Sequence, residues 1–240
     1  MSDMTSAPPQ STLALQLRRF RQNRLAMAGL VVLGLIVLAC FLGPYAFPFT
    51  GEDADFTAIA LPVDLLSAHP FGTDNFGRDL LVRTLEGGQV SLAIGFVGAF
   101  TAGVIGVLYG AVAGYIGGRI DGLMMRMVEI LYGFPYVILV ILLSLLFGGG
   151  NIALFAAIVF TLWLTPAVIV RAQAQALARR EFIEAARAGG MRTGQIILTH
   201  IVPNTLSVVI VYGSLLVPEV ILSESFLSFL GIGIKEPQAS

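Results

Sequence analysis

The sequence predicts an all-α integral membrane protein that crosses the bilayer about five times. Of its 240 residues, 56% are hydrophobic and only 12% are charged, which leaves too little polar material to cover a water-exposed globule. The 27 glycines lie mostly inside the apolar segments, as is typical of closely packed membrane helices. Open strands are excluded as spanning elements because their edge groups would be unpaired in lipid.

Five segments are long and apolar enough to cross the bilayer. About 20 helical residues span roughly 30 Å of hydrocarbon, because each residue adds about 1.5 Å. The segments cover residues 25–47, 90–116, 127–147, 152–170 and 201–222. The first follows four arginines but exceeds the roughly 7 to 15 apolar residues of a secretory signal, so we expect it to be a retained membrane anchor.

The distribution of basic residues predicts the orientation of these spans. Four arginines precede the first span, two separate the second from the third, and five lie within residues 171–192. Residues 50–89 carry two arginines and seven acidic residues. Because positive charge is retained in the cytoplasm, we expect the N-terminus and the loop at 171–200 to be cytoplasmic. The chain then divides into residues 1–87, with the N-terminal arm, first span and outer loop, and a core of residues 88–240.

The second predicted span carries small residues at four-residue spacing. This spacing places them on one helix face and lets a neighbouring backbone approach closely. We therefore expect the span to be buried against other helices; lining a path that opens when the helices move is the alternative. The residues of the two registers are Ser91, Gly95, Ala99 and Gly103, and Gly106, Gly110, Gly114 and Gly118.

The segment at residues 177–204 is too charged to span the membrane but is rich in residues that favour helix. Gly189 and Gly190 are expected to end a first short helix, and Thr193 to cap a second. Pro203 fits the first turn of the next span. The sequence therefore predicts a helical hairpin on the cytoplasmic side, held between two spans, which a partner protein can push.

Two local ion-pair patterns are predicted near the cytoplasmic side. Glu184 lies four residues after Arg180 and three before Arg187, which puts all three on one helix face. Glu129 lies three residues after Arg126, and we expect these two to pair near the interface. Pairing in water contributes only about 0.2 to 1 kcal/mol, so surface charge alone does not hold the hairpin.

The same hairpin contains a spaced motif. Glu184-Ala185-Ala186 is followed by Gly190 six residues after the glutamate and by Pro203 thirteen residues further on. This spacing resembles the EAA loop of binding-protein-dependent ABC importer permeases. Residues 200–204 (HIVPN), 224–231 (ESFLSFLG) and 69–79 (HPFGTDNFGRD) resemble the peptide and nickel branch of that family, in its dipeptide and oligopeptide permease C-like group. The resemblance covers nearly the whole chain from about Leu15.

The resemblance implies a fold and an assembly. It implies the type I ABC importer permease fold, also described as MetI-like, with six spans in a bacterial or archaeal cytoplasmic (inner) membrane. The sixth span would follow the region that matches Pro237 to Ser240, so the chain is expected to be C-terminally truncated relative to the family. A homologous permease subunit would form the other half of the pore. Two ABC ATPase subunits would use ATP and Mg on the cytoplasmic side.

Cargo and cofactors follow from the same resemblance. A periplasmic or lipid-anchored substrate-binding protein would deliver peptides or related small solutes, nickel complexes among them. The chain itself is expected to hold no cofactor, no metal and no catalytic residue, and to contact membrane lipid but no nucleic acid.

Two sets of residues are assigned roles. The resemblance implies that the ATPase-coupling residues are Glu184, Ala185, Ala186, Gly190, His200, Pro203 and Asn204. Docking or gating at the binding-protein face is the preferred hypothesis for Gly72, Thr73, Asp74, Gly77, Arg78, Asp79 and Arg83. Asp79 and Arg83 also have the spacing of an ion pair on a short helix, which Gly87 and Gly88 would end.

Two acids lie near the outer end of the fifth span. Glu219 and Glu224 lie about 24 Å and 31 Å from Pro203 along a helix, and their five-residue separation places them about 140° apart around it. We expect polar contacts with the partner permease, and a substrate or proton site is the alternative. Pro218 removes a backbone donor and is expected to kink the span.

Other functions lack the residues that they need. Lys235 is the only lysine and precedes Glu236, which excludes a GxxxxGK[ST] nucleotide-binding loop. Cys40 is the only cysteine, so no disulfide forms within the chain. His69 has acids but no second histidine nearby, which disfavours a metal site. HExxH and GxSxG motifs do not occur.

Two alternative functions stay open. An ion-coupled secondary transporter also uses packed glycines and buried carboxylates, although it has no evident use for a hairpin at Glu184. Uptake that follows an ion gradient and persists without ATP would support it. The other alternative is a noncatalytic membrane scaffold, if truncation abolishes transport.

Overall fold

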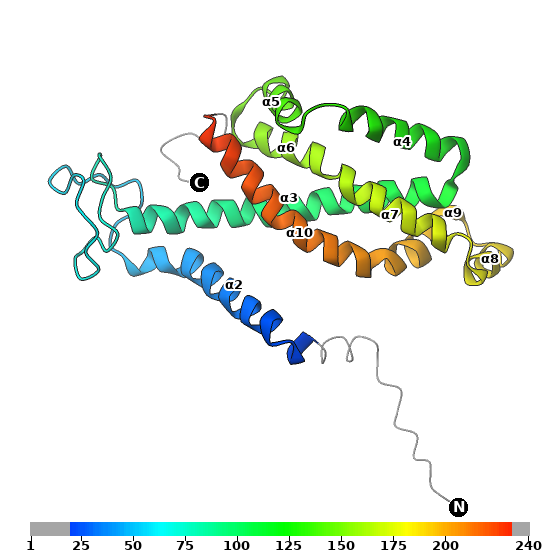
Figure 1. The fold of residues 1–240 in the computed structure, drawn as a ribbon, viewed down its shortest axis with the longest axis horizontal. Coiled ribbons are helices and arrows are strands. Elements are labelled where there is room, and N and C mark those ends of the chain that lie inside the picture. Colours follow the sequence, from blue (N-terminus) through cyan, green and yellow to red (C-terminus); the bar gives the residue numbers. More distant parts are fainter. Residues whose placement is uncertain (1–19, 232–240) are drawn as a thin grey trace, which may run out of the picture. The chain divides into compact units, whose positions relative to one another are not determined.

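The computed structural model describes residues 20–231, and its regular elements over that range are all helices (Figure 1). The N-terminal arm up to Arg19 and the region matching Pro237 to Ser240 lie outside the described residues. The prediction of an all-α protein is confirmed. In chain order the elements are α2 (Arg24–Leu42), a 3-10 turn (Gly43–Ala46), α3 (Leu80–Ile116), α4 (Gly118–Tyr132), α5 (Tyr136–Leu146), α6 (Gly150–Leu162), α7 (Leu164–Leu177), α8 (Glu181–Ala188), α9 (Thr193–Ile196), a π-helical turn (Ile197–Ile201) and α10 (Val202–Phe229).

Four helical stretches are long and apolar enough to cross a membrane, and α4 with α5 forms a fifth, bent candidate. The four are Arg24–Ala46, Leu80–Ile116, Gly150–Leu177 and Thr193–Phe229. They correspond to the first, second, fourth and fifth predicted spans. The prediction of about five spans is therefore confirmed.

The third predicted span, residues 127–147, is not a continuous helix. The chain bends by 97° between α4 and α5. Gly133 ends α4, and Pro135 adopts an extended ψ of 126° before α5 begins. Proline has no amide hydrogen and disfavours helical backbone at the residue before it, here Phe134, so the apolar segment contains a break that its hydropathy does not reveal.

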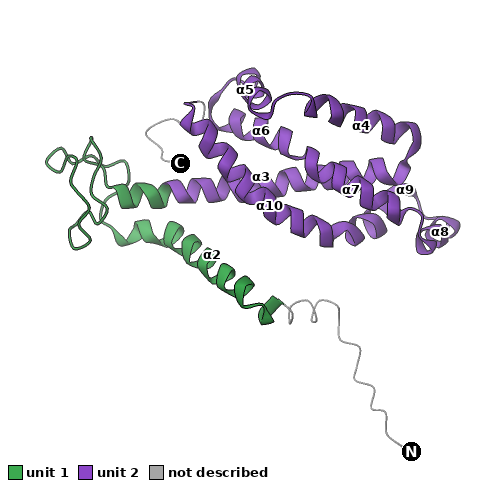
Figure 2. Ribbon diagram, viewed as in Figure 1, with its two compact units in different colours: residues 1–86 green, residues 87–240 purple. Residues whose placement is uncertain are grey.

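The chain forms two compact units, residues 1–86 and residues 87–240, and the boundary falls within α3 (Figure 2). In the first unit, the Asn23 side chain caps α2 by accepting hydrogen bonds from the amides of Leu25 and Ala26. Cys40 is the one buried residue of α2. The remaining apolar side chains of this helix are available to contact lipid.

Helix α3 continues through Gly87 and Gly88, so the prediction that these glycines end a short helix is wrong. Each glycine costs a helix about 1 kcal/mol relative to alanine. Ending the helix near the membrane would leave backbone donors and acceptors unpaired at several kcal/mol each, and this larger cost keeps the helix intact.

The second unit has two apolar clusters. The larger joins α3, α4, α5, α6, α7 and α10 around Ile158, Trp163 and Val220. Here the rings of Tyr109 and Trp163 meet edge to face, with centroids 4.7 Å apart, and the Tyr109 hydroxyl donates to the carbonyl of Met124. The smaller cluster lies where α3 and α7 meet the α8–α9 hairpin, and it positions the candidate site.

Glycines of α3 bring its backbone directly against α7. A Cβ atom on any of three of them would overlap a backbone carbonyl of α7 or of the α6–α7 junction, so no larger residue fits without moving a helix. At Gly95 an added Cβ would instead overlap the side chain of Ile221 in α10. The glycine and carbonyl partners are Gly106 with Trp163, Gly110 with Ala167, and Gly114 with Arg171.

Candidate functional site

The hairpin predicted at residues 177–204 is present as α8 and α9. Arg180 has extended backbone and precedes α8. Gly189 ends the helix, and Gly190 has a φ of +82°, the left-handed conformation that glycine adopts without steric cost. The amide of Met191 then donates to the carbonyl of Ala186, which closes the turn. The prediction that Gly189 and Gly190 end the first helix is confirmed.

The second half of the hairpin differs from the sequence prediction. Thr193 is the first residue of α9 rather than its cap, and the helix start is closed by Gln195, whose side chain accepts from the Arg192 amide. The chain then continues as helix into α10, with a π-helical turn in place of a break. Pro203 has no amide hydrogen to offer the preceding turn, which accounts for the altered hydrogen-bond ladder there.

One face of the hairpin is buried in the second unit. Ile183 of α8 is fully buried. It belongs to the cluster that also contains Ile196, Ile197 and Ile201, and this cluster packs against Val170 and Ala174 of α7 and Ala111 of α3. In Figure 1, α8 lies beyond the ends of α7 and α9, at one end of this unit. Helix α8 is therefore packed directly against α3 and α7 through this cluster.

The opposite face of α8 is open. Glu184 and Ala185 are exposed and Ala186 is half-buried. Phe182 is 44% exposed, and its ring meets that of His200 at a centroid distance of 6.2 Å. Helix α8 therefore exposes a carboxylate at Glu184 and, separately, an aromatic ring at Phe182.

The predicted ion pairs of Glu184 are wrong. Arg180 lies outside the helix, with extended backbone. Arg187 donates to the hydroxyl of Tyr115 in α3 at 3.3 Å, and its guanidinium lies 5.5 Å from the centre of that ring. A cation over an aromatic ring competes well with a solvent-exposed pair, and it ties the hairpin to α3. The Glu184 carboxylate consequently stays at the exposed surface.

The residues at 200–204 shape the entry into α10. The side chain of Asn204 donates to the carbonyl of His200 at 2.6 Å. The amide of Val202 donates to the carbonyl of Ile197, five residues back. The Asn204 side chain thus gives the His200 carbonyl a hydrogen-bond donor at the start of α10.

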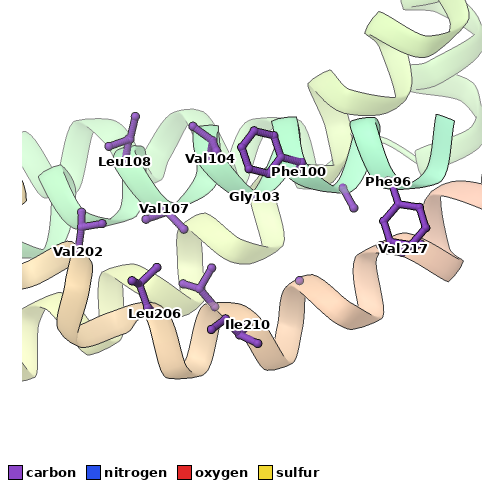
Figure 3. Close-up of a pocket in the computed structure, with 13 residues that line it drawn as sticks. Phe96, Phe100, Gly103, Val104, Val107, Leu108, Val202, Leu206, Ile210 and Val217 are labelled. Atoms are coloured by element: carbon purple, nitrogen blue, oxygen red, sulfur yellow. The ribbon is translucent and has the colours of Figure 1, made fainter. Parts of the chain in front are cut away.

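An apolar groove of about 480 Å³ separates α3 from α10. Val107 of α3 lies opposite Leu206 of α10 across it (Figure 3), and Phe96, Phe100 and Val104 also line it. Gly103 and Gly213 also line the groove, and a Cβ on either would meet no atom within 4 Å. The sequence did not reveal this groove.

The loop at residues 50–79 of the first unit is held by Thr73 and Asp74. The hydroxyl of Thr73 donates to the carbonyl of Ala58 and accepts from the amide of Leu61. Asp74 accepts from the amides of Phe76 and Arg78 and from the Arg78 side chain at 2.7 Å. Partial burial acts to raise the pKa of Asp74, but these hydrogen bonds and the arginine charge outweigh it, so the pKa lies below its ordinary value of 3.8.

Two glycines permit the turns of this loop. Gly72 and Gly77 both have a φ of +75°, and a Cβ on Gly77 would overlap the carbonyl of Asp55. The predicted docking residues from Gly72 to Asp79 therefore lie in a folded loop, and Arg83 lies in α3. Within residues 20–231, no group of three or more His, Cys, Asp or Glu side chains is placed to hold a metal ion.

The predicted pair of Asp79 and Arg83 is wrong. The Asp79 carboxylate caps α3 by accepting from the Val82 amide at 2.7 Å, and its other oxygen lies 2.9 Å from Nδ1 of His69. Arg83 donates to the carbonyl of Gly51. Capping a helix N-terminus satisfies an otherwise unpaired amide and places the negative charge favourably, so it wins over the local pair.

The acids near the spans fall into three environments. Arg126 and Glu129 pair at 3.0 Å on the exposed surface of α4, as predicted. Glu224 is 1% exposed and accepts a hydrogen bond from the Ser228 hydroxyl, so its side chain is buried within the described part of this chain. Glu219 lines a cavity of about 450 Å³, together with Tyr136, Pro218 and other residues of α5 and α10. Helix α10 runs unbroken through Pro218.

Comparison with known proteins decides the family. Residues 106–239 match the family described as "Binding-protein-dependent transport system inner membrane component". Residues 11–67 match the "N-terminal TM domain of oligopeptide transport permease C".

The chain belongs to the inner membrane permeases of binding-protein-dependent transport systems.

Characterised members of the permease family resemble it over most of its length. It is 50% identical to the oligopeptide transport system permease protein OppC of Haemophilus influenzae, over 93% of this chain and 72% of the relative. It is 51% identical to OppC of Escherichia coli K12, over 93% and 74%, and 44% identical to the dipeptide transport system permease protein DppC of Bacillus subtilis, over 93% and 69%.

The residues that sequence reasoning missed in this permease are mostly apolar or distant in the chain. The hairpin is held by three buried isoleucines, Ile183, Ile196 and Ile197. Isoleucines within this otherwise charged segment were a usable signal that one of its faces is buried. The Tyr115 partner of Arg187 lies 72 residues away, so no local spacing points to it.

The lowered pKa of Asp74 makes the loop at residues 50–79 of the permease sensitive to acid. A depressed folded-state pKa contributes stability above the ordinary value of 3.8 that is lost as the pH falls through the lowered pKa. Asp74→Asn is therefore expected to speed hydrogen exchange of the loop amides several-fold at neutral pH, with the difference from wild type shrinking below pH 3.8. Exchange measured by mass spectrometry over peptides from residues 50–79 checks this. A difference that stays constant into acid would contradict it.

Proposed function

We propose that this permease imports peptides as one half of a membrane pore, with α8 as the element through which ATPase subunits drive it. A homologous permease forms the other half. Two ATPase subunits bind ATP and Mg on the cytoplasmic side, and a substrate-binding protein delivers peptides at the outer loop. The printed names of the relatives, oligopeptide and dipeptide transport permeases, support the peptide class.

The observation that carries the proposal is the two-sided hairpin. Its inner face is anchored by Ile183 in the cluster with α3 and α7, and its outer face presents Glu184, Ala185 and Phe182. A rigid helix that is buried on one side and open on the other converts the motion of a docked partner into movement of the spanning helices. Gly190, His200, Pro203 and Asn204 then act by holding the two ends of the hairpin in place.

Orientation and the remaining predicted sites follow from this proposal. The N-terminus and α8 lie on the cytoplasmic side, and the loop from Gly72 to Arg83 faces the binding protein. Gly95, Gly106, Gly110 and Gly114 pack the helices, while the groove between α3 and α10 contributes to the path.

Replacing Glu184 tests the coupling. The permease is reconstituted in proteoliposomes with its permease partner, ATPase subunits and binding protein, and uptake of radiolabelled trialanine is measured with and without ATP. Glu184→Ala is expected to lower ATP-dependent uptake about tenfold or more, because losing one charged contact at a buried interface costs about 2 kcal/mol or more. Membrane insertion should be unchanged, since the side chain is exposed.

The control is Glu129→Ala, which removes another exposed glutamate, on α4. It should leave uptake near the wild-type rate. Equal uptake by wild type and Glu184→Ala would contradict the role of α8. Wild-type uptake that persists without ATP and follows an ion gradient would contradict the proposed function and support the secondary transporter.

A further inference from the structure

A partly buried charged cluster links α4 to α7 at a point that the coupling motif does not include. Asp121 lies in the first turn of α4 and is 7% exposed. Arg171 of α7 grips it with two hydrogen bonds, Nε to Oδ1 at 2.5 Å and an Nη to Oδ2 at 2.6 Å. Gln175, one turn further along α7, donates to Oδ2 at 3.0 Å. We call these three residues the α4–α7 clamp.

The hydrogen bonds of the α4–α7 clamp hold the Asp121 carboxylate firmly. Both oxygens of Asp121 accept hydrogen bonds, and the two-point geometry fixes the relative direction of the two side chains. The carboxylate also lies at the N-terminus of a 15-residue helix, where the helix dipole favours negative charge. Removing one partner of such a pair leaves a buried charge unpaired, which is strongly unfavourable.

The clamp lies where the hairpin joins the spanning helices. The carbonyl of Arg171 is the surface against which Gly114 of α3 packs. Ala174, between the two clamp donors of α7, belongs to the same apolar cluster as Ile183 of α8. The clamp therefore ties α4 to the segment of α7 that contacts both α3 and the hairpin.

Irregular backbone lies on either side of the region where α4, α7 and the hairpin join. Helix α4 ends at the Gly133–Pro135 break, where the chain bends by 97°. On the other side of the hairpin, the chain enters α10 through the π-helical turn Ile197–Ile201. Local departures from the regular helical ladder are the places where a helix changes direction most easily.

We infer that Asp121 is a positioning residue for coupling, which makes α4 move together with α3, α7 and the hairpin and so carries the ATPase-driven motion to the Gly133–Pro135 break. The inference rests on the proposed function, because it assigns a route to the motion that enters at α8. Asp121 touches neither peptide nor nucleotide in this role. It acts only through Arg171 and Gln175.

The test measures how many ATP molecules are hydrolysed for each trialanine taken up. In the reconstituted complex, Asp121→Asn is expected to lower trialanine uptake about tenfold, while binding-protein-stimulated ATPase activity falls much less. The ratio of ATP hydrolysed to trialanine taken up should therefore rise several-fold. The charge exchange Asp121→Arg with Arg171→Asp restores the pair and should recover uptake relative to Asp121→Arg alone. Arg126→Gln breaks the exposed pair with Glu129 on the same helix and should leave the ratio unchanged.

Each outcome is decisive. If Asp121→Asn hydrolyses as many ATP molecules for each trialanine taken up as wild type does, whether or not both activities fall, the clamp only supports folding and the inference is overturned. If the charge exchange gives no recovery although the double variant inserts and assembles, the direct pairing with Arg171 is refuted as the route. A wild-type complex without ATP-dependent uptake would instead refute the proposed function, which separates the two failures.

Discussion

Gly110→Ala is expected to destabilise the permease more than any other single-methyl change in the second unit. The new Cβ would overlap the carbonyl of Ala167 and crowd the amide of Arg171, and both are backbone atoms that cannot rotate away. Overpacking a close contact costs about 1 to 3 kcal/mol, and the upper end applies where backbone must move. The helices would have to separate along the line that Gly106 and Gly114 also occupy.

Fluorescence of Trp163 measures this effect directly. The chain has one tryptophan, and its carbonyl contacts Gly106 while its ring meets Tyr109 of α3. Thermal unfolding of the purified permease in detergent, followed by this fluorescence, is expected to show a midpoint for Gly110→Ala several degrees below wild type.

Gly103→Ala is the matched control. It adds the same methyl group to the same helix, but no atom lies within 4 Å of the new Cβ. Alanine favours helix over glycine by about 1 kcal/mol, so this variant should be unchanged or slightly more stable. Equal destabilisation by both variants would show that glycine is needed in α3 for its backbone alone, and would contradict the packing explanation.

The parts of the fold that depend on apolar segment length and on helix-ending glycines were predictable from the sequence. The spans follow from apolar length, because only a helix satisfies its backbone over roughly 30 Å of hydrocarbon. The hairpin follows from a charged, alanine-rich segment ended by Gly189 and Gly190. These signals depend only on residues that are near one another in the chain, and both the spans and the hairpin are present in the structure.

The parts that depend on contacts distant in the chain were not predictable. Asp121 and Arg171 are 50 residues apart, and nothing near either residue indicates the other. Glu184 and Asp79 each had an arginine at helical spacing, but neither predicted pair forms. Arg187 contacts Tyr115 instead of Glu184, and Asp79 caps the start of α3 instead of pairing with Arg83. Local spacing gives only the pairs that are available, and tertiary contacts decide which of them form.

The break at residues 133–135 shows a different limit. Glycine and proline were both visible there, but the flanking apolar residues on either side favoured a single span. Within lipid a proline is tolerated in a helix, so its presence alone does not mark a break. The 97° bend requires that the freed backbone groups be paired elsewhere, and that information lies in the folded unit.

Gly190→Val is expected to abolish coupled uptake while the chain still inserts. Gly190 has a φ of +82°, and a β-branched residue there is strongly strained. A strain of about 1 to 3 kcal/mol falls on a turn that joins two short helices, so α8 would lose its fixed direction. Because Ile183 anchors only the inner face, a reoriented α8 would no longer present Glu184 correctly. ATP-dependent trialanine uptake in proteoliposomes is the measurement, with membrane insertion scored in parallel.

Two neighbouring substitutions separate backbone strain from loss of space. Gly190→Asn should retain most uptake, because asparagine tolerates the left-handed region far better than valine does. Gly189→Ala should also be tolerated, since Gly189 has a φ of −73° and the nearest atom to its Cβ position, the Ala185 carbonyl oxygen, is at an ordinary contact distance of 3.4 Å. No atom lies within 4 Å of a Cβ on Gly190, so crowding cannot explain a loss there. If valine and asparagine at position 190 impair uptake equally, the conformation of the turn is not what couples α8 to the spanning helices.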